Sequence, residues 1–420
     1  FHDIAKATTI VSLDADFLGA GPLQVPNTRG WANGRKVNHG KMSRVWIAEP
    51  GLSVTGANAD ERSPMNPAAV ATIATYIAKQ IAHTDMAIDG TVALTAEQQT
   101  WADTLVADLQ HAGKHGLVMA GASQPASVHY LVAQINEALG SVGTTVSYRS
   151  AGSKENATIQ SLSTAMENSS VQGVIILGGN PAYDAPAELN IASAIKALPF
   201  SIHLANNEDE TSNVCKWHVN AAHWLESWSD GLAADGTICV GQPLIQPLFN
   251  GVTPTELLAI LAGEEVTDGQ TLVRATLFGA SADNRNVKWR NAVHDGVVAN
   301  SAMLEKPPVA RKAPKGGTVV GGVGYTACFV PSGAVWDGTH ANNGWLQELP
   351  DSITKLTWDN AALISPKTAE ALSVKQGDML KVSVGSKNIL IAALPVPGTA
   401  DDVVMLPLGS VSYTHLRAHE

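Results

Sequence analysis

The stretch Val174–Tyr183, VIILGGNPAY, constrains the fold of this chain more than any other. It opens with a short apolar run, and two glycines, an asparagine and a proline follow at once. Such a run predicts a strand buried on both faces of a parallel sheet. Glycines allow a tight turn and close approach of a ligand, and in open α/β sheets ligands lie beyond the carboxyl ends of the strands. Any ligand crevice is therefore expected just after Leu177.

Composition narrows the class of protein. The chain has 420 residues, of which 45% are hydrophobic, enough for two or three domains. Its net charge of −11, without a block of like charge, argues against nucleic acid as a partner and gives no sign of a membrane-surface patch. The 3 cysteines lie far apart and form no CxxC pair, so we expect no iron–sulfur cluster held by this chain itself.

Strands alternate with helices as far as Leu204, which predicts βαβ units and a parallel sheet covered on both faces. The expected strands are 7–17, 44–48, 117–120, 145–148, 173–177 and 200–204, and the expected helices are 67–82, 95–111, 125–139, 157–167 and 187–198. Leu13–Pro22 and Leu177–Pro186 both end a strand and turn through glycine to proline. This echo suggests two similar α/β lobes over residues 1–240, facing each other across a cleft. The alternative is that any strand-to-helix connection favours Gly and Pro.

The pattern changes after the second lobe. Residues 241–345 predict a helical and irregular connection, with a capping-box helix at Thr253–Leu261 and a Pro/Gly/Lys linker at about 304–324. Residues 346–409 predict a small closed β-barrel, with strands at 361–364, 379–384, 389–394 and 403–406. The last residues, 410–420, continue no earlier pattern, and Phe1 begins directly in a strand-like segment. We expect a fragment of a longer protein with a truncated or foreign tail.

Two clusters of polar side chains could carry chemistry. Asp14 and Asp16 are expected on one face of a strand, where a carboxylate pair could bind a metal or act as acid and base. The competing interpretation is that one caps the next turn and the other accepts hydrogen bonds from ribose or backbone. Cys215, His218 and His223 include ligands that zinc accepts, but their spacing is unusual and a second cysteine is missing. We expect the two histidines to bond loop backbone and the neighbouring tryptophans to pack.

Known catalytic motifs are missing: there is no Gly-x-Ser-x-Gly elbow and no GxGxxG after the first strand. Three blocks nevertheless resemble the molybdopterin-dinucleotide oxidoreductase superfamily. Gly178–Pro181 looks like its strand-end GxNP loop, and Asp209–Thr211 with His223–Trp228 looks like its Thr-to-Glu segment. Asn360–Gly377, with the later Pro407–Gly409, resembles its C-terminal dinucleotide-binding barrel and is the most specific match.

A narrower resemblance covers nearly the whole chain, from Phe1 to about Gly409. It is to the Tat-variant-translocated molybdopterin oxidoreductase-like proteins that form the large iron–sulfur subunit of alternative complex III. The stretches that carry it are Ser12–Pro22, Glu49–Arg62, Ile176–Pro186, His203–Asp230 and Ala341–Leu363. The tail, 410–420, does not fit it.

This resemblance implies an α/β fold with parallel-sheet lobes of the molybdopterin-oxidoreductase type and a C-terminal barrel. It also implies a bacterial respiratory complex that oxidises quinol and passes electrons to a periplasmic carrier. The implied partners are quinol-oxidising membrane subunits and cytochrome c subunits, with this chain peripheral on the periplasmic side of the inner membrane. The α/β half would hold no molybdenum cofactor, and the iron–sulfur clusters would sit in a half that follows the barrel.

We therefore expect a non-catalytic scaffold with no catalytic residue, no metal ligand and no cofactor of its own. Phe17 and Leu18 would put bulk where a cofactor loop is small, and Trp217–Trp228 would suit a subunit interface. The main alternative is an active molybdopterin-dinucleotide oxidoreductase, and a third possibility is a plain binding protein of two α/β lobes.

The alternative assigns roles to six residues. Gly178, Gly179 and Asn180 would present backbone donors to phosphate, Asp209 and Thr211 would contact one pterin or guanine group, and Asn360 would contact the other. The two pyrophosphates would also need cations, yet residues 173–198 contain only Lys196. In a scaffold the same residues would be turn formers.

Overall fold

The computed structural model describes residues 1–37, 42–149, 157–280, 282–283, 285–306, 313–314, 319 and 324–409. The chain divides into two compact units. Unit 1 combines Phe1–Tyr148 with the part from Glu305 onward, and unit 2 is Arg149–Leu304. The predicted boundaries at 240 and 345 describe a different division and stay a prediction.

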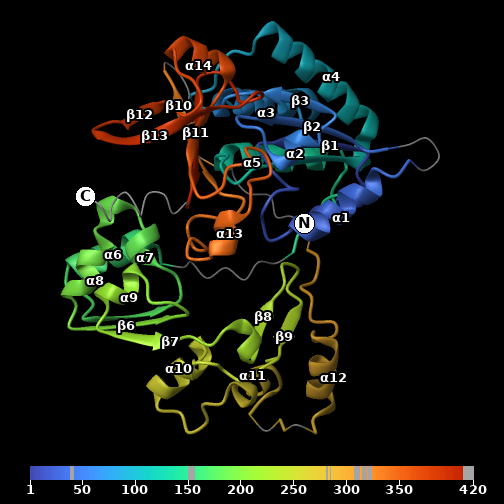
Figure 1. Ribbon diagram of the computed structural model, residues 1–420. Helices are drawn as coiled ribbons and strands as arrows, with labels where there is room; N and C mark the ends of the chain where they lie inside the picture. The colour runs from blue at the N-terminus through green and yellow to red at the C-terminus, as the bar shows by residue number, and fades with distance from the viewer. Residues whose placement is uncertain are drawn as a thin grey trace. The chain divides into compact units, whose positions relative to one another are not determined.

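Unit 1 begins with a four-stranded parallel sheet in the order β3-β2-β1-β4. Its strands are β1 (Thr9–Leu13), β2 (Arg44–Glu49), β3 (Glu61–Pro64) and β4 (Gly116–Ala120). On one face Val11, Leu13 and Trp46 pack into a core built with α3 (Pro67–Ile81), α4 (Ala96–Ala112) and α5 (Ala126–Ala138) (Figure 1). On the other face the core includes Ile10 and Val45, beside η1 (Ile4–Lys6) and α1 (Gln24–Gly34).

Local capping explains why these helices begin where the sequence predicts. Asn66 Oδ1 accepts a hydrogen bond from the backbone N–H of Ala69 at 2.8 Å, and Pro67 occupies the first helical position of α3. Thr95 and Gln98 form the predicted capping box of α4. The remaining short elements of this region are α2 (Val54–Ala57) and η2 (Gly113–His115).

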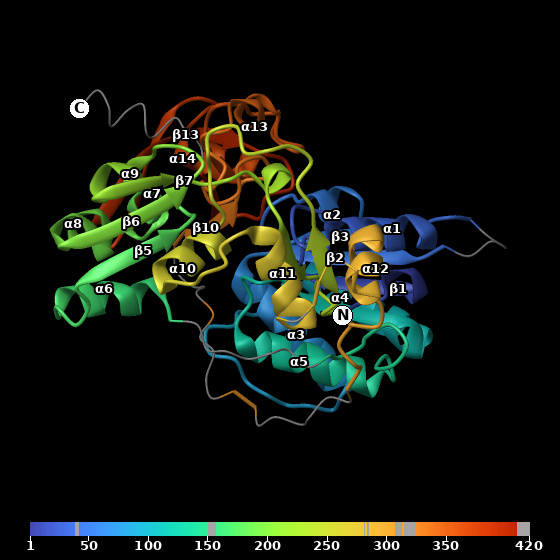
Figure 2. The same ribbon diagram turned by 90° about the horizontal axis from the view of Figure 1, so that it is seen from below.

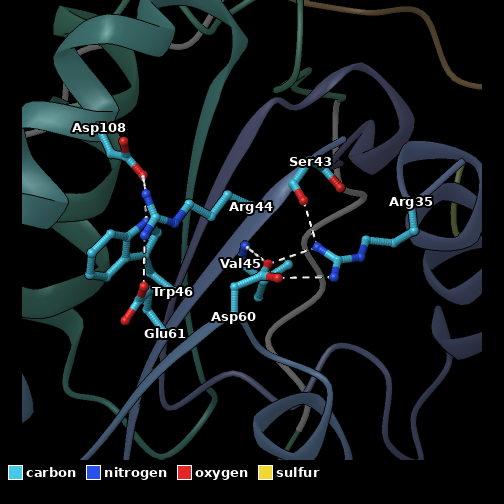
Figure 3. Close-up of polar contacts among 8 residues, drawn as sticks. All are labelled: Arg35, Ser43, Arg44, Val45, Trp46, Asp60, Glu61 and Asp108. Atoms are coloured by element: carbon cyan, nitrogen blue, oxygen red, sulfur yellow. Dashed lines mark hydrogen bonds and ion pairs between the residues drawn. The ribbon is translucent and has the colours of Figure 1, made fainter. Parts of the chain in front are cut away.

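The amino-terminal edge of this sheet is joined by charged side chains (Figure 3). Arg44 donates to Glu61 Oε1 at 2.6 Å and to Asp108 Oδ2 at 3.2 Å, and Trp46 Nε1 donates to the same Asp108 oxygen at 2.9 Å. These bonds connect the starts of β2 and β3 to α4. A bidentate ion pair between Arg35, the C-cap of α1, and Asp60 ties the end of α1 to the same end of the sheet.

The later part of unit 1 forms a five-stranded mixed sheet in the order β10-β14-β11-β13-β12. Its strands are β10 (Thr326–Pro331), β11 (Ala361–Ile364), β12 (Met379–Val384), β13 (Lys387–Pro395) and β14 (Val403–Leu408), with α13 (Gly344–Glu348) and α14 (Pro366–Leu372) between them. Among the described residues β10 and β12 are the two outer strands and do not pair with each other. The predicted strands are present, but a closed barrel is not confirmed.

Unit 2 contains a three-stranded parallel sheet in the order β5-β6-β7. Its strands are β5 (Gly173–Leu177), β6 (Phe200–Ala205) and β7 (Trp217–Asn220), accompanied by α6 (Ile159–Glu167), α7 (Pro181–Asp184), η3 (Ala187–Leu189), α8 (Ile191–Ala197) and α9 (Glu210–Val214). The rest comprises η4 (Trp224–Glu226) and the hairpin of β8 (Ser229–Leu232) and β9 (Ile238–Gly241), labelled in Figure 1. Helices α10 (Pro254–Ala262), α11 (Gly269–Phe278) and α12 (Val287–Asp295) follow (Figure 2).

The prediction that Val174–Leu177 lies in a strand buried on both faces is wrong. Its strand, β5, is at an edge of the three-stranded sheet, and its side chains alternate in exposure. Ile175 and Leu177 are 39% and 38% exposed, whereas Val174 and Ile176 pack against a buried cluster. A short apolar run does not distinguish these two environments, because both require the same residues.

Three further expectations need correction. Residues 145–148 form no strand, because Val146 makes only isolated bridges. The helix expected over 187–198 is split into η3 and α8 at Asn190, which adopts a left-handed conformation with φ of 47°. Asp14 and Asp16 follow the end of β1 and do not lie on it.

No helix in the described part of the chain has both the length and the apolar character needed to cross a membrane.

Candidate functional site

The turn after β5 is built from two glycines in the left-handed region. Gly178 and Gly179 both have φ of 77°, and a Cβ added to either would meet nothing within 4 Å. Glycine is therefore required here by backbone conformation rather than by crowding. The Gly178 N–H donates to Leu204 O at 2.8 Å, so it is engaged within the sheet. The N–H groups of Gly179 and Asn180 have no partner among the described residues.

Asn180 and Thr211, both predicted site residues, bond directly to each other. Asn180 Oδ1 accepts from the Thr211 hydroxyl at 2.7 Å and from its N–H at 3.1 Å, and Asn180 Nδ2 donates to Glu210 Oε2 at 2.7 Å. The Thr211 hydroxyl oxygen also accepts from Ala182 N–H at 3.0 Å. Thr211 is fully buried. These polar groups therefore join the turn to α9 and α7.

Asp209 and Asn360 lie in different units. Asp209 is the N-cap of α9, where its Oδ1 accepts from Ser212 N–H at 2.9 Å. Asn360 precedes β11 of unit 1, is 9% exposed, and its N–H donates to Asp359 Oδ1 at 2.7 Å. The structure thus brings five of the six predicted residues together in unit 2, and the sixth belongs to the other unit.

The matching turn in unit 1, after β1, is bonded across to the loop after β4. Asp14 has φ of 60°, and its Oδ2 accepts from the Ser123 hydroxyl and from Gln124 Nε2, the latter at 3.1 Å. Gly121 N–H donates to Leu13 O at 2.9 Å, and a Cβ on Gly121 would lie 1.7 Å from Asp14 O. Burial raises the pKa of Asp14, and the bonds from Ser123 and Gln124 partly oppose this.

Asp16 bonds the first turn of the short helix α2, whose N-cap is Ser53. Its Oδ1 accepts from Thr55 N–H at 2.8 Å and from the Thr55 hydroxyl at 2.7 Å, while Leu18 N–H donates to Thr55 Oγ1 at 3.0 Å. Phe17 and Leu18 are 8% and 5% exposed and pack in the core beneath the sheet. Their bulk therefore contributes to that core, and their expected effect on a cofactor loop stays a prediction.

A buried ion pair at the carboxyl ends of the strands of unit 1 was not predicted from the sequence. Glu49, the last residue of β2, accepts from Arg62 Nε at 2.6 Å and from the Ser53 hydroxyl at 2.5 Å. The Glu49 side chain is 3% exposed and that of Arg62 is 14% exposed. Burial raises the pKa of Glu49, and Arg62 opposes this. The sequence signal was a carboxylate at a strand's carboxyl end with an arginine on the next strand.

The histidines near Cys215 have structural partners. His218 Nδ1 lies 3.0 Å from Ser212 Oγ, and His223 Nδ1 accepts from Leu225 N–H at 3.2 Å in a capping box of η4. Cys215 packs beside the buried cluster of α8, and burial raises its pKa. Across the described ranges, no group of three His, Cys, Asp or Glu side chains is arranged to hold a metal ion.

Among solved structures, the chain is similar to acetylene hydratase from Pelobacter acetylenicus. The TM-score is 0.61 at 11% sequence identity, over 97% of this chain and 72% of that chain. No family model matches the sequence, and no curated protein matches it. At this identity the likeness concerns the fold alone. The chain therefore has a molybdopterin-oxidoreductase-like fold, with parallel α/β sheets and a mixed C-terminal sheet.

Proposed function

We propose that this chain is a non-catalytic, molybdopterin-oxidoreductase-like scaffold region of the large iron–sulfur subunit of alternative complex III. In this proposal it belongs to a quinol-oxidising membrane complex and lies peripherally on the periplasmic side of the bacterial inner membrane. Its partners would be quinol-oxidising membrane subunits and cytochrome c subunits. The iron–sulfur clusters would be held in a half that follows the barrel-like region. The membership in this complex rests on the sequence resemblance alone.

The observation that supports a scaffold most is the bonding across the sheet of unit 1. With the strand order β3-β2-β1-β4, the switch point lies between β1 and β4. Doubly wound sheets keep their ligand crevice at that point. Here Asp14 bonds Ser123 and Gln124, and the turn backbones approach closely at Gly121. The groups that would face a ligand are thus directed at each other.

The residues of unit 2 also fit a pterin dinucleotide poorly. A pyrophosphate calls for cations and several unengaged backbone donors. Here Gly178 N–H is bonded to Leu204, Thr211 is bonded to Asn180, and the only basic residue of 173–198 is Lys196. We therefore assign no reaction step to a molybdenum cofactor in this chain.

Exposed tryptophans support a role in assembly. Trp217 and Trp224 are 65% and 70% exposed, whereas Trp228 packs against Trp289 with ring centroids 5.6 Å apart. Aromatic residues are enriched in protein interfaces. The first two side chains are therefore candidates for contact with another subunit.

The test is metal and pterin analysis of the intact protein purified from its native membranes. Elemental mass spectrometry and the fluorescence of oxidised pterin are measured on the same sample, with an authentic molybdopterin enzyme as a positive control. Iron without molybdenum, tungsten or pterin supports the scaffold. Stoichiometric molybdenum or tungsten with pterin contradicts it. Recovery of the protein without membrane or cytochrome subunits would contradict the proposed complex.

One observation favours the alternative, an active molybdopterin-dinucleotide oxidoreductase. The Gly178–Gly179 turn is open above both glycines, and the N–H groups of Gly179 and Asn180 have no partner in the described part of the chain. Two such donors at a strand end could receive one phosphate oxygen. The pterin analysis separates the two functions, because only the alternative requires pterin.

A further inference from the structure

The helices α11 and α12 of unit 2 border a cavity that lies outside the candidate site. The two helices are beside each other (Figure 1, Figure 2), and the cavity lies between the end of α11 and the start of α12. It has a volume of about 500 Å³ and is lined by Leu277, Phe278, Asn286, Val287 and Lys288. Small-molecule sites combine a mostly apolar lining of comparable volume with a few polar groups, and three of these five residues are apolar.

The apolar floor of the cavity rests on a packed aromatic cluster. Phe278 meets the buried Trp289 edge to face, with ring centroids 6.3 Å apart, and Trp289 packs against Trp228 at 5.6 Å. Leu277 packs against the same buried cluster. The floor is therefore held in place by the core of this region, and a preformed floor reduces the ordering that a ligand would have to induce.

Val287 continues the apolar lining to the rim of the cavity. It is the first residue of α12, and its side chain is 66% exposed. Acidic side chains are favoured in the first turn of a helix, so helix formation alone gives no reason for an exposed valine here. Its contribution is apolar surface at the mouth of the cavity.

Lys288 places a cation at the same rim without a counter-charge. The carboxylates nearest to it in sequence are engaged elsewhere: Asp283 pairs with Arg285 at 2.9 Å, and Asp295 lies 2.7 Å from His294 Nδ1. In the described ranges no carboxylate pairs with the Lys288 ammonium. Its three N–H donors are therefore available to an anion.

The sequence around the cavity is basic, although the whole chain has a net charge of −11. Residues 274–294 contain one acidic residue, Asp283, and four basic residues, Arg274, Arg285, Lys288 and Arg290. This local excess of positive charge favours a negatively charged ligand.

The end of α12 itself adds little to the attraction of an anion. Asn286 Oδ1 accepts hydrogen bonds from the N–H groups of Lys288 and Trp289, at 3.0 Å and 3.2 Å. The helix is thus already capped by its own side chain. The charge of the ligand is selected by the Lys288 ammonium rather than by the helix terminus.

We propose that this cavity binds a single-chain anionic amphiphile, such as a medium-chain carboxylate. Its head bonds the Lys288 ammonium through a charge-assisted hydrogen bond, and its tail covers the apolar lining. A single chain is assigned because about 500 Å³ lies in the lower half of the range for ligand pockets. The site is separate from the Gly178–Asn180 turn, so the proposal goes beyond the proposed function and does not depend on it.

The test is equilibrium dialysis of the full chain against radiolabelled decanoate, below its micelle-forming concentration, at neutral pH and physiological salt. We expect saturable binding of one equivalent. Acetate has the head without the tail, and decanol has the tail without the charge. Each should compete at least about tenfold more weakly than unlabelled decanoate, because each lacks one of the two interactions.

Lys288→Met removes the charge but keeps a long, unbranched side chain, and it should weaken decanoate binding by about tenfold or more. Arg290→Met is the matched control. It removes a positive charge from an exposed position on the same helix that does not line the cavity. Because salt screens charges at that range, it should change the affinity by less than about twofold.

Val287→Asp is an independent variant that should keep the fold. An acidic residue suits the first turn of α12, but here it places a carboxylate on the cavity lining. Decanoate binding should become unmeasurable. Near-ultraviolet circular dichroism, which reports the packing of Trp228 and Trp289, establishes that each variant is folded.

Three outcomes would overturn the proposal: no saturable binding of decanoate, equal competition by decanol, or an unchanged affinity in Lys288→Met. Sedimentation with phosphatidylglycerol vesicles distinguishes a lipid surface from a free ligand. If Lys288 is needed for that sedimentation while free decanoate does not bind, the cation recognises a membrane surface and the assignment of the cavity is wrong.

Discussion

The two strand-end turns that share a glycine–proline pattern have opposite structures. After β1, Asp14 reaches across to Ser123 and Gln124, and the turns meet at Gly121. After β5, Gly178 and Gly179 lie under open space, and the polar bonds run back to β6 and α9. Gly and Pro therefore decide where a chain turns, whereas the side chains that follow decide whether the end of the strand is closed by other loops or open.

The largest expected loss of stability concerns the buried ion pair of Glu49 and Arg62, at the carboxyl end of the sheet in unit 1. Glu49→Gln leaves the Arg62 guanidinium without its counter-charge, and removing one partner of a buried pair costs about 3–5 kcal/mol. Denaturant unfolding of the full chain measures this loss. Glu61→Gln is the control, because its pair with Arg44 is about two-fifths exposed, at 43% and 39%, and such pairs contribute at most about 1 kcal/mol. Equal losses of stability for both variants would show that the buried pair contributes no more than the exposed pair.

A methyl group on Gly121 should break the closed turn itself. An added Cβ would lie 1.7 Å from a backbone oxygen of Asp14, which cannot rotate away. We expect Gly121→Ala to lower the free energy of unfolding by about 3 kcal/mol, the upper range for overpacking. Gly21→Ala, whose Cβ would meet nothing within 4 Å, is the control and should have a small effect. A well-tolerated Gly121→Ala would contradict the close approach of the two loops.

At the open turn the same change should be milder and have a different cause. Gly178 has φ of 77°, and an L-residue in that region is disfavoured by about 1–2 kcal/mol. Gly178→Ala should therefore lose about that much stability, without any steric clash. Gly231→Ala, also in unit 2 and also unobstructed, controls for the added methyl group. A loss as large as that of Gly121→Ala would mean that the turn after β5 is closed as well.

The smallest expected effect is a pH dependence of protein stability that arises from Asp14, in the turn after β1. Burial raises the pKa of Asp14 above its usual value near 3.8, so the folded state binds more protons than the unfolded state in the window above that value. Stability should then fall as pH rises through the raised pKa, and Asp14→Asn should flatten this slope. Some slope should persist, because burial also raises the pKa of Glu49. Unfolding of the native chain and of Asp14→Asn at a series of pH values tests this, and a stability difference between the two that does not change with pH would contradict it.

Much of the fold could be predicted because local rules decide it. Asn66, Thr95 and Thr253 cap helices as their sequence neighbours indicate, since each N-cap side chain accepts a hydrogen bond from its own first turn. Non-local features could not be predicted in this way. The edge position of β5 and the end-to-end order of the mixed sheet depend on which strands pair, and a single sequence does not contain that information.

The sequence predicted several residues of the candidate site, but it did not predict which of them bond to each other. Asn180 and Thr211 were both predicted site residues, and the structure joins them to each other. The contacts of His203 in β6 could not be predicted, because one histidine in an apolar strand has the pattern of an ordinary core residue. The residues that it contacts, Asp209 and Ser212, come from α9 and its N-cap, so only the tertiary structure reveals these contacts.

The discontinuity of unit 1 has a consequence for synthesis. Domains form in order as the chain leaves the ribosome, but the two segments of unit 1 flank the whole of unit 2. The bond from Ala400 N–H to Pro50 O, and the packing of Met405 on Gly51, become available only after unit 2 has emerged. Unit 2 can therefore complete its contacts first, while the loop at Pro50 and Gly51 still lacks the contacts that the carboxy-terminal part of unit 1 provides. Slow synthesis of unit 2 would thus delay the completion of unit 1.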